Sequence, residues 1–137
     1  PPKATFGKAA SYNYKNTFYN EYPHLRGKIH NVHHAVPQEW MKLGIISPEK
    51  MHSVENLRGI PKDVLPKRVG ENGKLKEAFG NDLHQSQINK AWKEQKKIWK
   101  TKYGDLRNVK ENELLDFAYE IDKKFGHLFW PPVPPLP

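Results

Sequence analysis

Aromatic and aliphatic positions divide the first part of the chain into two short segments. Five aromatic side chains lie among polar residues between positions 11 and 28, and their spacing predicts a helix over residues 14–21. Residues 28–36 alternate loosely between apolar and polar positions and include β-branched side chains. This pattern predicts a strand or an extended segment directly after the helix.

Proline and cap residues define the next segments. Pro37 can begin a short helix over residues 38–43. Ser47, followed by a proline and an acid, is a typical N-cap and predicts a second short helix that reaches about Ser53. Residues 56–60 are then expected to be extended.

The strongest helical pattern follows a loop-like stretch. Residues 61–83 contain several glycines and are predicted to form a loop. Residues 84–103 repeat core-type positions at helical spacing while lysines occupy the other face, and Gly104 would end this helix. The core-type positions are Ile88, Ala91, Trp92, Gln95 and Trp99.

A last helix is predicted near the C-terminus. Asn108 and Glu111 have the spacing of a capping box, so the helix should start at Asn108 and end at Gly126 in the left-handed conformation. Its buried stripe is expected to be Leu114, Leu115, Ala118, Ile121 and Phe125. The whole pattern predicts an α+β fold, a helix-rich single domain with a small β component.

Composition and charge limit the possible functions. The 137 residues fit one domain, and 23 Lys and Arg against 15 Asp and Glu leave a net charge of +8, which favours a polyanion or an acidic protein as partner. The absence of Cys excludes a disulfide framework, a Cys-type zinc finger, a thiol nucleophile and an iron–sulfur site. Any metal must therefore bind His, Asn or carboxylate side chains.

No apolar run approaches a membrane span, and the first residues lack the apolar core of a signal peptide.

Histidine and asparagine recur in three blocks, at residues 30–34, 55–61 and 83–92. Together they supply imidazoles on an extended segment, an asparagine in a turn and an imidazole at the start of a helix. These are the donors that a single divalent-metal site needs when no thiol is present.

The three blocks read H-H-x-V-P-Q, E-N-L-R-G-I-P and L-H-x3-I-x3-W in this order. This succession resembles the HNH nucleases of the ββα-metal superfamily, and more narrowly the C-terminal toxin domains of bacterial polymorphic toxins of the Rhs and contact-dependent types. The resemblance covers about residues 28–100. It implies a β-hairpin crossed by a helix that holds one divalent ion, and metal-dependent cleavage of nucleic-acid phosphodiesters.

The resemblance also implies roles for individual residues. His33 would bind the metal, His34 would be the general base, Asn56 would brace the hairpin loop and orient the base, and His84 would be the metal ligand from the helix. The ion would be Mg²⁺, Mn²⁺, Ni²⁺ or Zn²⁺. Such chemistry suits these side chains, because a divalent ion neutralises phosphate charge and a neutral imidazole with a pKa of about 6.5 can accept a proton from water.

Two parts of the ligand set stay open. In an ideal strand His34 shares a face with His30 while His33 points the other way. If His33 and His34 are both to reach one site, the segment must bend or leave regular β geometry there, and His30 is therefore an alternative to one of them in the site. The DNase colicins carry a second histidine one turn along the helix, after an isoleucine. Here Asn89 follows Ile88, so either Asn89 is a weaker oxygen ligand or water fills that position.

Further residues near the three blocks have two interpretations. Arg58 could bind a phosphate oxygen or could pair with an acid such as Glu55. Glu39 could extend the ligand set but is expected to face solvent. The remaining histidines are expected at the surface, namely His24, His52 and His127.

Positive charge concentrates between positions 84 and 110, where eight basic residues stand against two acids and account for +6 of the net +8. Lysines on one face of the predicted helix could line the phosphate backbone, with binding that weakens as salt rises. The alternative is a solvated face opposite the buried Trp92 and Trp99. The lysines proposed to bind nucleic acid are Lys90, Lys93, Lys97 and Lys100. Nothing indicates readout of base edges, so little sequence specificity is expected.

The resemblance divides the chain into four parts: a lead-in at residues 1–27 that packs on the core, an HNH-like core at residues 28–104, a C-terminal helix at residues 105–128 and a proline-rich tail at residues 129–137. The tail could bind a partner as a polyproline II segment or could be extended and laid back on the domain.

Three functions are compatible with the sequence. The first is a DNA-cleaving nuclease toxin, which implies a cognate acidic immunity protein attracted by opposite charge. It would be released from a larger bacterial toxin, secreted or injected, and act in the target-cell cytoplasm. The second is a non-catalytic basic module that binds nucleic acid or an acidic protein. The third is an HNH-type nuclease that acts on RNA, since lysine contacts to phosphate look alike in both nucleic acids.

Overall fold

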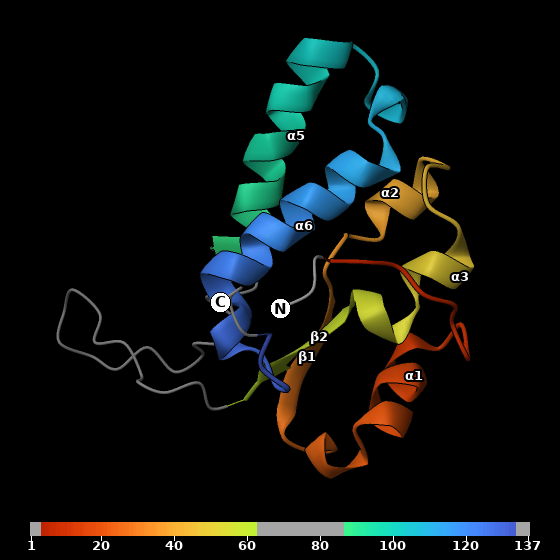
Figure 1. The fold of residues 1–137 in the computed structure, drawn as a ribbon, viewed down its shortest axis with the longest axis vertical. Helices are drawn as coiled ribbons and strands as arrows, with labels where there is room; N and C mark the ends of the chain where they lie inside the picture. The colour runs from red at the N-terminus through yellow and green to blue at the C-terminus, as the bar shows by residue number, and fades with distance from the viewer. Residues whose placement is uncertain (1–3, 63–86, 134–137) are drawn as a thin grey trace, which may run out of the picture.

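The computed structural model describes residues 4–62 and 87–133. Within these ranges it contains five α-helices and one two-stranded antiparallel sheet, an α+β domain as the sequence predicts (Figure 1). The helices are α1 (Tyr14–Glu21), α2 (Glu39–Lys42), α3 (Pro48–Met51), α5 (Asn89–Tyr103) and α6 (Glu111–Phe125), and the strands are β1 (Ile29–His34) and β2 (Leu57–Pro61). One-turn 3-10 helices lie at Pro23–Leu25, Val54–Asn56, Leu106–Asn108 and Gly126–Leu128.

Local signals place the elements of the first half where the sequence predicts them. Asn13 caps α1, since its side chain accepts a hydrogen bond from the Asn16 amide. Ser47 caps α3 in the same way by accepting from the amide of Lys50. Gly44, which follows α2, has a φ of +83°, a conformation that glycine adopts without strain.

β1 and β2 pair antiparallel, with His34 opposite Leu57 at one end of the ladder. A β-bulge interrupts the register, and the extra residue is His30. Ile29 and Val32 therefore belong to the same apolar cluster although they lie three positions apart. The bulge thus changes which strand residues share a face.

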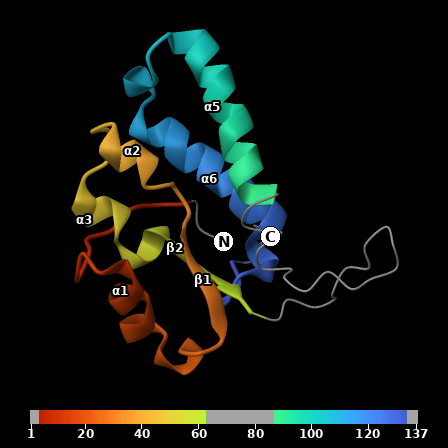
Figure 2. The ribbon, with the colours of Figure 1, turned by 180° about the vertical axis from the view of Figure 1, so that it is seen from behind.

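The two faces of the hairpin are covered by different helices (Figures 1 and 2). The smaller cluster lies between α1 and one face, and consists of Phe18, Leu25, Ile29, Val32 and Leu57. The larger cluster joins Ile60 of β2 to side chains of α2, α3, α5 and α6. The hairpin therefore lies between α1 and the crossed pair α5 and α6.

α5 buries the two tryptophans that the sequence assigns to the core. Trp92 and Trp99 are both buried, and the Trp92 ring meets the Phe117 ring edge-on at a centroid distance of 4.7 Å. Gly104, with a φ of +74°, ends the helix as predicted. The predicted first residues of this helix, including His84, and the predicted loop beyond Lys62 lie outside the described residues.

The predicted caps of the last helix are wrong. α6 begins at Glu111 after the N-cap Lys110, which makes no side-chain cap, and Asn108 instead ends a separate 3-10 turn. Gly126 has a φ of −58° rather than a left-handed conformation. A glycine is needed at position 126 because the backbone of Val133 lies so close that a Cβ at this position would collide with it.

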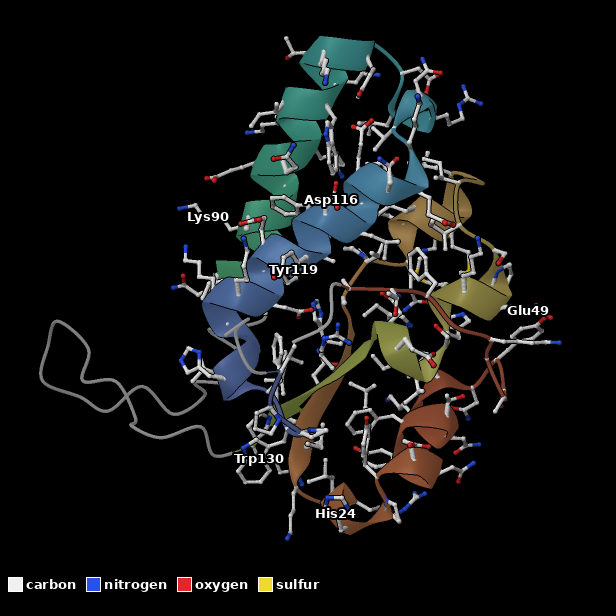
Figure 3. The ribbon with its side chains drawn as sticks, viewed as in Figure 1. His24, Glu49, Lys90, Asp116, Tyr119 and Trp130 are labelled. Carbon is white, nitrogen blue, oxygen red and sulfur yellow. The ribbon has the colours of Figure 1, made fainter. Side chains whose placement is uncertain are left out.

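Both ends of the described chain pack on the domain. The Gly7 amide donates to the Ser53 hydroxyl over 3.0 Å, which holds the lead-in against the turn after α3. The Trp130 amide donates to the Gly59 carbonyl over 2.8 Å, and Figure 3 shows Trp130 beside the hairpin. Up to Val133 the proline-rich tail is therefore laid back on the domain.

Of the helices in the described ranges, none combines the length and the apolar character that crossing a membrane requires.

Candidate active site

Residues of β1, of the segment after it and of α5 line a pocket of about 310 Å³. Successive residues of a strand point to opposite faces, so a pocket lined by consecutive residues must lie along the edge of β1. The described lining residues are Tyr14, Asn31, Val32, His33, His34, Pro37, Gln38 and Asn89. His33, His34 and Asn89 are thus brought together, as the sequence predicts for one site.

His33 and His34 reach this pocket without a bend between them. His33 lies opposite Arg58 in the ladder, and His34 points to the other face, where its ring centroid is 4.5 Å from that of Tyr14. The strand irregularity is at His30 instead, which is exposed and does not line the pocket. The ladder is regular at His33 and His34, so the expected bend or departure from β geometry is not found there, while both residues line the pocket.

His34 contacts His52, which the sequence predicts at the surface. His34 Nε2 lies 3.1 Å from Nδ1 of His52, and both residues are buried, at 5% and 7% exposed. The Tyr14 ring stacks on the His52 ring at a centroid distance of 5.7 Å. The surface assignment of His52 is wrong because α3 ends there and turns the side chain toward β1. No local sequence signal indicates a contact across 18 positions.

Burial keeps both rings of this histidine pair neutral. Removal from water lowers the pKa of His34 to about 3, and the neighbouring His52 adds to this shift. Burial also lowers the pKa of His52. At neutral pH each ring therefore carries one proton and one lone pair.

Asn56 braces the segment between β1 and α2. Its Oδ1 accepts from the Val36 amide over 2.9 Å, and its Nδ2 donates to the carbonyls of Val36 and Met51 over 3.2 and 2.9 Å. The Asn56 carbonyl accepts from the Ala35 amide at 2.8 Å. The side chain is almost completely buried, at 1% exposed. These bonds fix the backbone that directly follows His34.

Arg58 has a different partner from either of the two predicted. Its Nε and Nη2 donate to the two carboxylate oxygens of Asp122 in α6, over 3.0 and 2.9 Å. Its Nη1 donates to the backbone carbonyls of Glu55 and Leu57. The guanidinium is buried and committed to these bonds, so neither phosphate binding nor pairing with the Glu55 carboxylate describes Arg58. Asp122 carries no signal in the sequence that would have identified it.

A second hollow adjoins the histidine pocket. It has a volume of about 460 Å³ and is lined by Pro37, Glu39, Asn89, Trp92, Lys93, Lys96 and Lys97. Pro37 and Asn89 line both spaces, so the histidine pocket continues into this lysine groove. Glu39 does not simply face solvent, because its carboxylate pairs with Lys96 Nζ at 2.9 Å.

The four lysines predicted to bind nucleic acid are all exposed on α5. Figure 3 shows Lys90 pointing away from the domain in the first turn of the helix, whereas His24 lies far from it, beyond the end of α1. His24 and His127 are exposed, as the sequence predicts.

The donors in the pocket suit a divalent ion, since imidazole nitrogen and amide oxygen are common ligands of such ions. His33 and Asn89 supply these donors, and the third predicted ligand, His84, lies outside the described residues. Within residues 4–62 and 87–133 no group of three or more His, Asp or Glu side chains could hold a metal ion. The predicted ligand set therefore depends on His84.

Comparison with protein-family models, with curated proteins and with solved structures finds no match for this chain.

Proposed function

We propose that this chain is a metal-dependent endonuclease that hydrolyses DNA phosphodiesters with little sequence specificity. The observation that carries the proposal is a pocket lined by both His33 and His34, which continues into the lysine groove of α5. The proposal assigns the base and a metal ligand to the two histidines and the contacts to the phosphate backbone to the lysines.

His34 is the proposed general base. Its neutral ring accepts a proton from water, and the hydroxide formed attacks phosphorus while the bond from phosphorus to the leaving oxygen breaks. The leaving oxygen takes a proton from solvent water and ends as a hydroxyl, and the protonated His34 returns its proton to the solvent. A bound phosphodiester adds negative charge beside the ring, which raises the pKa of His34 back toward its usual value and strengthens the base. Asn56 holds the backbone after His34 and so fixes where this ring lies.

His33 and His84 are the proposed metal ligands, with Asn89 as an additional oxygen donor. The bound ion, Mg²⁺, Mn²⁺, Ni²⁺ or Zn²⁺, would neutralise charge on the phosphate. On α5 the proposed contacts to the DNA backbone are Lys90, Lys93, Lys97 and Lys100.

The resemblance to polymorphic toxin domains extends the proposal to partners and to the place of action. A cell that produces such a nuclease needs protection, so an acidic immunity protein is the expected partner, and the net charge of +8 would speed its association. The domain would act in the cytoplasm of the target cell after release from a larger secreted or injected toxin.

Plasmid nicking tests the proposal. The purified chain with each of the four metals should nick plasmid DNA, EDTA should abolish nicking, and His34→Ala should lose at least about 100-fold in rate. His24→Ala, which changes an exposed histidine far from the pocket, is the matched control. Calorimetry should detect one bound divalent ion, lost in His33→Ala and in His84→Ala.

Two other outcomes identify the alternatives. Cleavage of RNA without cleavage of the plasmid would show that the substrate of this site is RNA rather than DNA. Salt-sensitive binding of nucleic acid without cleavage or bound metal, unchanged by His33→Ala, His34→Ala and His84→Ala, would contradict a nuclease and identify a basic binding module.

A further inference from the structure

The His34–His52 pair is held from several sides. The two rings meet at an angle of 69°, with Nε2 of His34 facing Nδ1 of His52 at 3.1 Å. Tyr14 contacts both rings, and the His52 amide is bound to the Pro48 carbonyl at the end of α3. His34 lines the pocket while His52 does not, so His52 can act on a bound substrate only through His34.

A contact of this length between two ring nitrogens requires one proton between them. One nitrogen must donate an N–H and the other must accept with a lone pair. A neutral imidazole carries a single ring proton, so the direction of this bond decides the state of the remaining nitrogen. If His34 donates from Nε2, its Nδ1 keeps a lone pair. If His52 donates, Nδ1 of His34 carries the proton and the one lone pair of the ring, on Nε2, accepts the bond from His52.

The two directions differ in the tautomers that they need. When His34 donates, both histidines carry their proton on Nε2, which is the more stable tautomer of a histidine side chain in water. When His52 donates, both rings must adopt the less stable tautomer with the proton on Nδ1. The 3.1 Å contact allows both directions, and the more stable tautomers favour His34 as donor.

We propose that His52 is a positioning residue whose Nδ1 accepts a hydrogen bond from His34 Nε2, which leaves the lone pair of His34 on Nδ1. The importance of this bond for catalysis rests on the proposed role of His34 as general base. The tautomer itself does not depend on that role, so it can be measured in the protein alone.

Long-range proton–nitrogen NMR of the ¹⁵N-labelled full chain, with EDTA and without nucleic acid, reads the tautomer directly. His34 should show a protonated Nε2 and an unprotonated Nδ1. His52→Asn places an amide oxygen near the former Nδ1 position and should preserve this pattern. His52→Leu has a similar shape but accepts no hydrogen bond, so a minor population with the proton on Nδ1 should appear and the two His34 nitrogen signals should move part of the way toward each other. His127→Leu, at an exposed site, is the control and should change neither signal.

The activity of the same variants provides the second measurement. His52→Leu should lower the single-turnover rate of DNA nicking about 10- to 100-fold, the usual range for losing a residue that orients a reactive side chain, with little change in KM. His52→Asn should recover most of this rate, which a loss of packing alone would not predict.

The NMR results test the role of His52 independently of the proposed nuclease activity. A proton on Nδ1 of His34 in the wild-type chain, or the same small Nδ1-protonated population of His34 in the wild-type chain and in His52→Leu, overturns the role of His52 even if the protein nicks DNA. The predicted tautomer pattern, partly lost in His52→Leu and kept in His52→Asn, supports it even if no nicking is found.

Discussion

Asn56 connects two backbone segments that are 20 positions apart in the chain. Its side-chain amide forms hydrogen bonds with the N–H of Val36 and with the carbonyls of Val36 and Met51. These bonds hold the segment after His34 against the turn before β2. The resemblance to HNH nucleases predicts this bracing role, and the hydrogen bonds of the buried side chain agree with it.

Asn56→Ala should destabilise the fold strongly. The change leaves the Val36 amide and two carbonyls buried without their partner, which we expect to lower the free energy of unfolding by about 2–4 kcal/mol. Urea unfolding would measure the loss. Asn20→Ala, at an exposed position of α1, should change the stability by no more than about 0.5 kcal/mol. Equal stabilities of the two variants would contradict the bracing role.

The low pKa of His34 predicts that acid weakens the fold. Because its pKa of about 3 in the folded state lies below the ordinary value of 6.5, the unfolded chain takes up the proton first. The stabilisation is complete above pH 6.5 and is lost as the pH falls toward 3. Between pH 7 and pH 5 the free energy of unfolding should fall by about 2 kcal/mol from this ring.

Urea unfolding at pH 7, 6 and 5, in EDTA, checks this dependence. His34→Phe should remove more than half of the fall, and His127→Gln should leave the fall unchanged. If the wild-type chain and His34→Phe lose the same stability between pH 7 and pH 5, the ring is not buried in its neutral form.

At the scale of elements, α5 combines two faces with different partners. Trp92 and Trp99 lie seven positions apart, which is two helical turns, and pack into the larger core. Lys93 and Lys97 lie four apart on another face and line the groove beside the histidine pocket. The sequence period predicts both faces, but the position of the groove depends on where α5 meets α2.

Lys93→Gln and Lys97→Gln should each weaken DNA binding at every sequence tested. Each should also reduce the slope of log affinity against log salt by about 1, since one phosphate contact is lost. Lys102→Gln changes a lysine on the opposite side of the same helix and is the matched control. Fluorescence anisotropy with a short duplex in EDTA would measure the slopes. An equal effect of Lys102→Gln would show that only overall charge matters.

At the scale of the molecule, the Arg58–Asp122 pair joins the hairpin to α6 across 64 positions. Both side chains are buried, with 10% and 2% of their area exposed. A buried ion pair adds little net stability, but removal of one partner leaves the other charge without compensation. The stability of the contact between α6 and the hairpin therefore depends on the presence of both charges.

Asp122→Ala should cost about 3–5 kcal/mol in the free energy of unfolding, because the Arg58 charge stays buried. The double variant Arg58→Met with Asp122→Leu should cost clearly less than the sum of the single changes. Glu111→Gln breaks the exposed pair with Lys50 and should cost less than about 1 kcal/mol. Chemical unfolding of the wild-type chain, of these variants and of the single changes Arg58→Met and Asp122→Leu would test this, and additive costs would contradict the coupling.

The elements themselves follow from the sequence, because periodicity, caps and glycine stops act within a few residues. The bounds of α1 and the end of α5 at Gly104 agree with the pattern, and the paired histidines, Asn56 and the lysine face are visible without a structure. The start of α6 was misassigned since the spacing of Asn108 and Glu111 imitates a capping box while the chain forms a 3-10 turn there.

Only the tertiary structure decides the contacts between distant positions. His52 reaches His34 across 18 positions and Arg58 reaches Asp122 across 64, and neither partner is marked in the local sequence. The bulge at His30 and the pocket at the edge of β1 likewise depend on how the strand pairs and what packs against it. The sequence determines which side chains this protein has available for chemistry. Packing decides which of them meet, because burial and hydrogen bonding are settled by neighbours that the chain order does not bring together.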